Sequence, residues 1–253
     1  AAAQGAGVEA ADFLGALIRG YEVVVRIGVS VGLGHYKYFH NTATCGPFGA
    51  ATAAASVLGL SDAQLADAIG NAGTLAGGLW QLRNEDVMSK QLHNAHAARS
   101  GLVAAYLAQR GLTGPRRILE GPQGFYAAMC PDADPVNLTA NPDAPWMVYD
   151  TSFKPWPACR HAHAAIDAML LLRDRVGDPD GIERIVVRTY DDAVAFCDRP
   201  DPKNIVDAKF SLQHVAAVVL REGKPTLSSF EPKVFLRDGM MAIREKVEVE
   251  AAP

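Results

Sequence analysis

Histidines and lysines stand close together at three places in the sequence. Six of the seven histidines form close pairs, and a lysine accompanies two of them. The pairs are His35 with His40, His93 with His96 and His161 with His163, and the lysines are Lys90 and Lys154. An imidazole can take up or release a proton near neutral pH, and a fixed ammonium group can bind a carboxylate. The combination predicts acid–base chemistry on a small carboxylate.

A metal site is the competing interpretation of the same histidines. His93 and His96 form an HxxH pattern, His161 and His163 an HxH pattern, and imidazole is a common ligand of transition metals. The strong zinc signature, however, spaces its histidines four residues apart with a glutamate between them. We therefore expect neither a metal ion nor a cofactor, and we keep the metal site as an alternative.

His40 is the second residue of the stretch "FHNTATCGPFGAATAAASVLGL", residues 39–60. Asn41, Thr42 and Thr44 follow it and are most simply helix caps, but their polar groups also suit a carboxylate at a helix N-terminus. Lys90 stands at the start of another helix, where the helix dipole disfavours a cation unless an anion or a buried partner is present. Lys90 and His93 share one helix face because they are three residues apart. Lys154 is held in a stiff segment by the prolines that follow it.

Composition and charge exclude several classes of protein. The 253 residues carry 24 basic and 28 acidic side chains with no basic block, so nucleic acid is not an expected partner. The four cysteines lie far apart without CxxC spacing, which disfavours an iron–sulfur cluster or a secreted disulfide scaffold and fits the cytoplasm. Charged residues interrupt the longest apolar stretch, residues 13–33, so we expect no membrane span.

The elements that position these residues are mostly helices. Apolar spacing and helix-start signals, including a Ser61–Gln64 capping box, predict helices over residues 8–31, 47–58, 61–79 and 90–109. Small residues dominate these segments, so they can pack closely. The second half alternates predicted helices at 162–176 and 208–223 with strands at 182–190 and 245–251. We predict a mainly α fold: an all-helical domain over residues 1–140 and a smaller α+β domain over 141–253.

Four stretches together resemble the MmgE/PrpD family. Residues 39–60 are similar to its aromatic-His-x-Thr-x-Thr stretch with a following alanine-rich helix. "MSKQLHNAHAARSGLVAAYLAQRGLTGPRRILEGPQGF" is similar to its Met-Thr/Ser-Lys-x-x-His segment with the later Gly-Pro and Leu-Glu-Gly landmarks. "FKPWPACRHAHAAIDA" and "AKFSLQHVAAVVLREG" are similar to its Lys-Pro-aromatic-Pro and Phe-Ser-aromatic segments. The resemblance covers most of the chain in the same order.

The resemblance implies an all-helical domain with a smaller α+β lid domain, usually in a homodimer, that acts on small di- or tricarboxylates without metal. Family activities are 2-methylcitrate dehydratase, cis-aconitate decarboxylase and iminodisuccinate epimerase. By position, His40 matches the central catalytic histidine, Lys90 and Lys154 match two carboxylate-binding lysines, and Thr42 or Thr44 matches the pocket wall. The predicted substrate-binding residues are Thr42, Thr44, His93, Cys159, Arg160 and His163.

Two positions depart from the family pattern. Cys159 stands where the decarboxylase has a histidine, and His214, which we include in the catalytic set, stands where many members have a tyrosine. Family chains are also longer at both ends, so each domain is expected to lack its outer part. We therefore expect acid–base dehydration of a 2-methylcitrate-like tricarboxylate. The alternatives are an epimerase or decarboxylase on a related acid, and an inactive fragment that binds a carboxylate or a partner.

Overall fold

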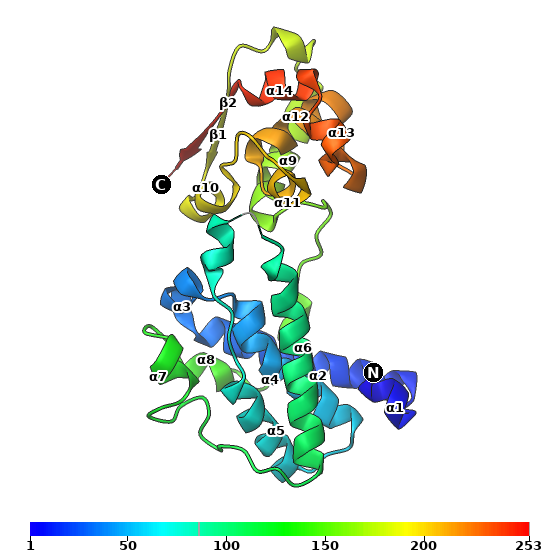
Figure 1. Cartoon of the computed structure of the whole chain (residues 1–253), viewed down its shortest axis with the longest axis vertical. Coiled ribbons are helices and arrows are strands. Elements are labelled where there is room, and N and C mark those ends of the chain that lie inside the picture. The colour runs from blue at the N-terminus through cyan, green and yellow to red at the C-terminus, as the bar shows by residue number, and fades with distance from the viewer. Residues whose placement is uncertain (86, 253) are drawn as a thin grey trace. The chain divides into compact units, whose positions relative to one another are not determined.

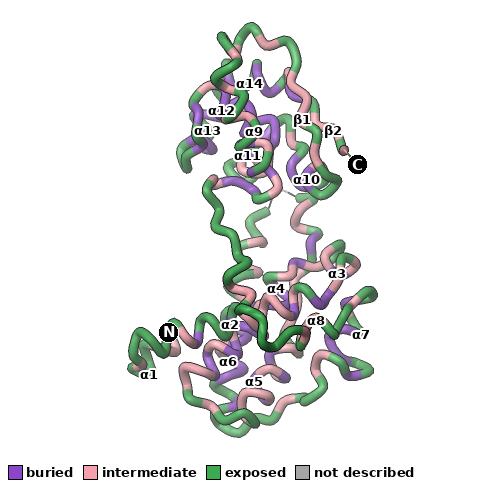
Figure 2. The backbone as a smooth tube through the Cα atoms, turned by 180° about the vertical axis from the view of Figure 1, so that it is seen from behind, coloured by how far each residue is buried: buried purple, intermediate pink, exposed green. Residues whose placement is uncertain are grey.

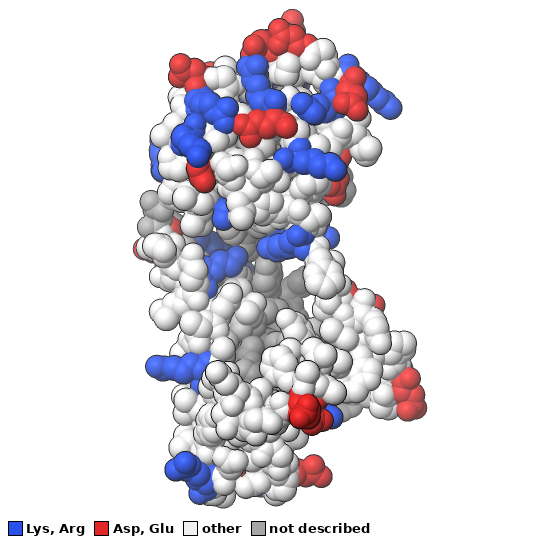
Figure 3. All heavy atoms as spheres, turned by 90° about the vertical axis from the view of Figure 1, so that its right-hand side faces the viewer, with Lys and Arg blue, Asp and Glu red and all other residues white. Residues whose placement is uncertain are grey.

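The computed structural model describes residues 1–85 and 87–252 as a mainly helical chain with one two-stranded sheet (Figure 1). This confirms the predicted fold class. The chain divides into two compact units, Ala1–Thr151 and Ser152–Pro253. Buried residues gather on α4 in the first unit and on α12 in the second (Figure 2). On the face in Figure 3, basic and acidic side chains are interspersed over the C-terminal unit.

The N-terminal unit is built around α4 (Asn41–Val57), which packs against α2 (Ala10–Ser30), α5 (Asp62–Thr74) and α6 (Ser89–Gln109). Shorter elements complete it. They are α1 (Ala2–Ala6), α3 (Gly32–Tyr38), η1 (Trp80–Asn84), α7 (Phe125–Met129), α8 (Val136–Thr139) and η2 (Met147–Asp150). The Ser61 hydroxyl accepts from the Gln64 backbone N–H, and the Gln64 side chain accepts from Ser61 in return, which confirms the predicted capping box.

Glycines let α4 approach its neighbours at backbone distance. A Cβ atom on Gly49 would lie 2.5 Å from the carbonyl oxygen of Gly20 in α2. A Cβ atom on Gly101 in α6 would lie 2.5 Å from the carbonyl oxygen of Pro47. Only residues without a side chain fit at such crossings, because protein interiors are closely packed. The predicted close packing of small-residue helices is confirmed.

The start of α4 differs from the prediction by six residues. We expected the helix to begin at Pro47, yet Pro47 lies inside it and His40 is the N-cap residue. A proline removes one hydrogen bond of the helix ladder. Pro47 is itself buried, with most of α4 around it. Packing along the whole helix therefore outweighs this local signal.

The C-terminal unit centres on α12 (Leu212–Glu222), which packs against α9 (His163–Arg173) and α14 (Asp238–Arg244). Strand β1 (Ile185–Thr189) pairs in parallel with β2 (Val247–Ala251), so both predicted strands are confirmed with shorter bounds. The remaining elements are η3 (Arg160–Ala162), η4 (Pro179–Gly181), α10 (Asp191–Cys197), α11 (Ile205–Lys209), η5 (Leu227–Phe230) and α13 (Pro232–Phe235).

Within residues 1–85 and 87–252, every helix is too short or too polar to cross a bilayer.

Candidate functional site

A short backbone pairing holds His40 at the start of α4. Phe39 forms an isolated antiparallel bridge with Leu79, and the His40 backbone N–H donates to the Gly78 carbonyl at 3.0 Å. Gly78 has a φ of +152°, and a Cβ atom there would lie 2.3 Å from the Cβ of Ala43. Both the backbone conformation and the available space therefore require glycine at this position.

Four further side chains, from η1 and the start of α6, lie around His40 and Trp80. His40 is 8% exposed, and its ring lies 4.4 Å from a Trp80 ring at an interplanar angle of 35°. Its Nδ1 atom lies 3.1 Å from the Nδ1 atom of His93. The Lys90 Nζ lies 5.6 Å from the centre of a Trp80 ring, and the Arg83 guanidinium carbon lies 5.3 Å from one. The structure thus brings together His40, Lys90 and His93, all predicted site residues.

Burial and nearby positive charge keep both histidines neutral. Burial, with smaller contributions from the charges of Lys90 and His93, lowers the pKa of His40 to about 4. Burial also lowers the pKa of His93, with smaller effects from His96 and Lys90. A neutral imidazole has one N–H and one nitrogen lone pair. At pH 7 the short Nδ1–Nδ1 contact is therefore a hydrogen bond in which one ring donates and the other accepts.

The Thr44 side chain forms its hydrogen bonds inside the N-terminal unit. It is fully buried, and its hydroxyl lies 2.8 Å from Nε2 of His35 and 3.4 Å from the His40 carbonyl oxygen. Nδ1 of His35 lies 3.0 Å from the Met129 carbonyl, which can only accept. His35 therefore carries its proton on Nδ1 and accepts from Thr44 through Nε2. Thr44 therefore forms its hydrogen bonds inside the unit, and its substrate-binding role stays a prediction. Thr42 is exposed in the first turn of α4.

The C-terminal unit gathers four predicted residues in the segment that leads into α9. Lys154 and Arg160 are exposed, whereas Cys159 and His163 are buried. The Cys159 backbone N–H donates to the Lys209 carbonyl at 2.8 Å, and Nε2 of His163 lies 3.3 Å from the Ala158 carbonyl. Of this group, Lys154 and Arg160 are the cations with exposed side chains, so they keep their predicted place as carboxylate-binding candidates.

His214 lies in the core of the C-terminal unit. It is fully buried, and its ring packs edge-on against Phe230 and Phe235. Its Nε2 lies 2.8 Å from the Ser229 carbonyl, while its Nδ1 is buried without a hydrogen-bond partner. Burial lowers the pKa of His214 to about 4. Neither ring nitrogen is exposed to a ligand, so the catalytic role that we expected for His214 is not carried forward.

The histidines of the metal alternative have other partners. Nε2 of His96 lies 3.3 Å from the Leu75 carbonyl, and Nδ1 of His161 lies 2.6 Å from the Tyr190 hydroxyl. Among residues 1–85 and 87–252, no three His, Cys, Asp or Glu side chains are grouped closely enough to share a metal ion.

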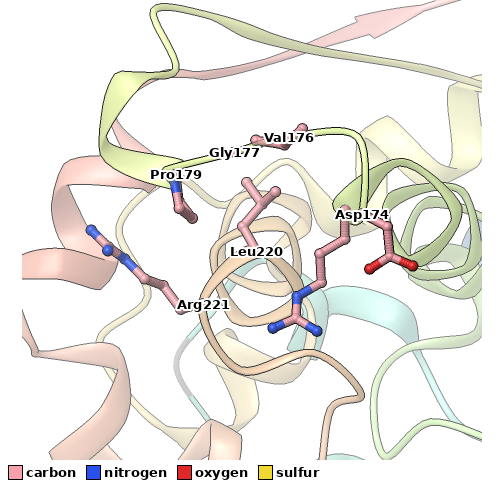
Figure 4. Close-up of a pocket in the computed structure, with 7 residues that line it drawn as sticks. Asp174, Val176, Gly177, Pro179, Leu220 and Arg221 are labelled. Carbon is pink, nitrogen blue, oxygen red and sulfur yellow. The ribbon is translucent and has the colours of Figure 1, made fainter.

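A cavity of about 440 Å³ lies in the C-terminal unit between the end of α9 and the end of α12 (Figure 4). Its wall includes Leu220, Val176 and Arg221, and the Arg221 guanidinium pairs with Asp180. None of the predicted site residues lines this cavity, and neither does any histidine. This cavity therefore does not bear on the acid–base role of His40, which stays a prediction.

Trp80 and Gly78 are important site residues that the sequence patterns did not indicate. They lie in "AGGLWQLRN", which runs from the end of one predicted helix toward the next. The signal that could have found them is the large aromatic residue two positions after a glycine pair and shortly before Lys90.

Comparison with known proteins gives two domain matches. The MmgE/PrpD N-terminal domain matches residues 1–137, and the MmgE/PrpD C-terminal domain matches residues 156–253.

Three curated relatives are similar over most of the chain. The cis-aconitate decarboxylase of Mus musculus is 33% identical over 226 residues, which are 86% of this chain and 45% of the relative. The Homo sapiens protein of that name is 33% identical over 225 residues, 86% of this chain and 46% of the relative. The cis-aconitate decarboxylase-like protein oryM of Aspergillus oryzae is 27% identical over 257 residues, which are 94% of this chain and 53% of the relative. The chain therefore spans about half the length of these relatives.

Proposed function

The chain belongs to the MmgE/PrpD family. From this premise we propose that it functions as a lyase on a small tricarboxylate. The favoured reaction is decarboxylation of cis-aconitate. The observation that carries the proposal is the neutral His40–His93 pair beside Lys90. This arrangement can move a proton next to a fixed positive charge, which is what chemistry at a carbon beside a carboxylate requires.

Decarboxylation is favoured over the expected dehydration of 2-methylcitrate because the curated relatives carry the decarboxylase name. Cys159 and His214 counted against decarboxylation in the sequence. Cys159 is 8% exposed, and His214 is fully buried. Buried side chains such as these have little access to a substrate. They are therefore weaker evidence about the reaction than exposed pocket residues would be.

The chemistry of decarboxylation matches the properties of the pair. Loss of a carboxyl group as CO₂ leaves an electron pair that the neighbouring C=C bond of cis-aconitate can delocalise, and one carbon of this carbanion must then receive a proton. We propose that the Nε2–H of His40 supplies it. The ammonium group of Lys90 would stabilise the negative charge that builds up before the proton arrives. Thr42, Lys154 and Arg160 retain their predicted roles in binding carboxylates.

A substrate panel tests the reaction. The protein is incubated with cis-aconitate, 2-methylcitrate, citrate and iminodisuccinate, and the products and released CO₂ are followed by ¹³C NMR. We expect CO₂ release from cis-aconitate. Turnover of 2-methylcitrate without CO₂ would instead support the hydro-lyase, and inversion of iminodisuccinate would support the epimerase. Binding of these acids with no turnover of any would support the inactive carboxylate-binding fragment.

A further inference from the structure

The two rings of the His40–His93 pair contact each other only through their Nδ1 atoms. Their Nδ1 atoms face each other at 3.1 Å. Neither Nε2 atom forms a hydrogen bond within residues 1–85 and 87–252, and neither belongs to the fully buried unpaired atoms there. Both Nε2 atoms are therefore accessible. The pair thus has one internal contact and two outward nitrogens.

This geometry ties the tautomers of the two rings together. Each neutral ring has a single N–H, and the internal hydrogen bond needs that hydrogen on one Nδ1 and a lone pair on the other. If His40 donates, its Nε2 has the lone pair and the Nε2 of His93 has the hydrogen. If His93 donates, the two outward nitrogens exchange roles. The neutral pair therefore always presents one base and one acid.

The number of protons that the pair can hold is also limited. One extra proton on either Nε2 makes that ring an imidazolium, and the Nδ1–H···Nδ1 bond survives. A second extra proton would place hydrogens on both Nδ1 atoms and would break the contact. The charge of Lys90, which lowers the pKa of both rings, opposes this second protonation. The pair is thus built to carry one proton at a time.

We infer that His93 and His40 form a proton relay that connects solvent to the substrate carbon through the two Nδ1 atoms. The inference rests on the proposed function for the identity of the reaction. His40 is the group that reaches the substrate, and His93 acts through it.

Each step of the relay is balanced. With His93 as the initial donor, its Nε2 takes a proton from solvent, and its Nδ1–H proton moves to Nδ1 of His40. The Nε2–H of His40 then passes to a carbon of the carbanion that loss of CO₂ leaves. Both rings end neutral, with the internal hydrogen bond reversed. Uptake of one solvent proton at His40 Nε2 and release of one from His93 Nε2 restore the starting state.

The His93→Asn variant separates a relay from a role in positioning. An asparagine side chain can keep a hydrogen bond to His40, but it cannot accept a proton on one atom and release one from another. A relay predicts that kcat falls by about 100-fold or more, the usual contribution of one proton-transfer group, while KM changes little. Near-normal kcat in His93→Asn, with a loss only in His93→Ala, would show positioning and overturn the relay. His96→Asn, one helical turn further along α6, is the matched control.

Solvent isotope effects give a second readout. In mixtures of H₂O and D₂O, a relay moves more than one proton in the rate-limiting step, so kcat falls along a curve as deuterium increases. We expect a straight line for His93→Asn because only one transfer remains. A straight line for the unmodified protein would contradict the concerted relay.

A measurement without substrate keeps this inference separate from the proposed function. ¹⁵N NMR of the ligand-free protein at pH 7 is expected to show one hydrogen shared between the Nδ1 atoms of His40 and His93. Hydrogens on both Nδ1 atoms, or on neither, would overturn the relay whatever the substrate is. Failure of every acid in the substrate panel, with the shared hydrogen present, would overturn the proposed reaction and leave the pair intact.

Discussion

Acid should destabilise the N-terminal unit through His40. The pKa of this histidine is about 4 in the folded chain, against 6.5 for the unperturbed group. The unfolded chain therefore binds the proton first as the pH falls from 6.5 to 4. Stability from the buried neutral ring is complete above pH 6.5 and is lost as the pH falls through this window.

The size of the effect follows from the shift. A difference of 6.5 − 4 = 2.5 in pKa corresponds to about 3.5 kcal/mol, at about 1.4 kcal/mol per unit, of which about 3 kcal/mol is lost by pH 4. His40 is only 8% exposed, so little of this is screened by solvent. His40→Asn removes the titrating group and keeps a polar side chain, so its stability should lack this component.

The assay compares urea unfolding of the two proteins between pH 7 and pH 4, using signals from the N-terminal unit. We expect the unmodified protein to lose about 3 kcal/mol more than His40→Asn over this range. Histidines that do not contact His40 titrate in both proteins and cancel in the difference, and a His93→Asn background removes the one that does. Parallel stability curves, or an NMR titration of His40 centred near pH 6.5, would refute the reasoning.

Three further predictions concern single substitutions. Lys90→Met removes a positive charge beside the histidine pair, so it should raise the pKa of His40 in an NMR titration and weaken citrate binding in calorimetry. Lys37→Met, at an exposed lysine, is the control. Equal citrate affinities of Lys90→Met and the unmodified protein would exclude the carboxylate-binding role of Lys90. Gly78→Ala should cost about 1–3 kcal/mol of unfolding free energy because of its φ of +152° and the contact with Ala43. Gly77→Ala meets no atom within 4 Å and should cost far less; equal urea midpoints would contradict this account. His214→Leu leaves the Ser229 carbonyl unpaired and should cost about 1–3 kcal/mol, while kcat per folded molecule stays within a few-fold; a large loss of kcat would restore its catalytic role.

Local patterns predicted the elements but not all of their bounds. The helix predicted over residues 8–31 is observed over Ala10–Ser30, and the capping box at Ser61 places the start of α5 correctly. These features depend on neighbours in sequence. The start of α4 was missed because burial along the whole helix outweighs one proline, and burial is not a local property.

The candidate site was only partly predictable for the same reason. Lys90 and His93 share a helix face, which follows from their spacing. The contact of His40 with His93 joins residues 53 positions apart and depends on the backbone pairing at Gly78. No spacing rule connects such segments. His214 was assigned from its place in the Phe-Ser segment, although nearly every residue of α12 is buried.

The most direct test of the central claim is the rate of CO₂ release from cis-aconitate by the unmodified protein and by His40→Asn, with His96→Asn as the control. If His40 is the proton-transfer group, His40→Asn should lose about 100-fold or more of kcat. It should still fold at pH 7, and His96→Asn should stay near the unmodified rate. CO₂ release by His40→Asn at the unmodified rate would contradict the account.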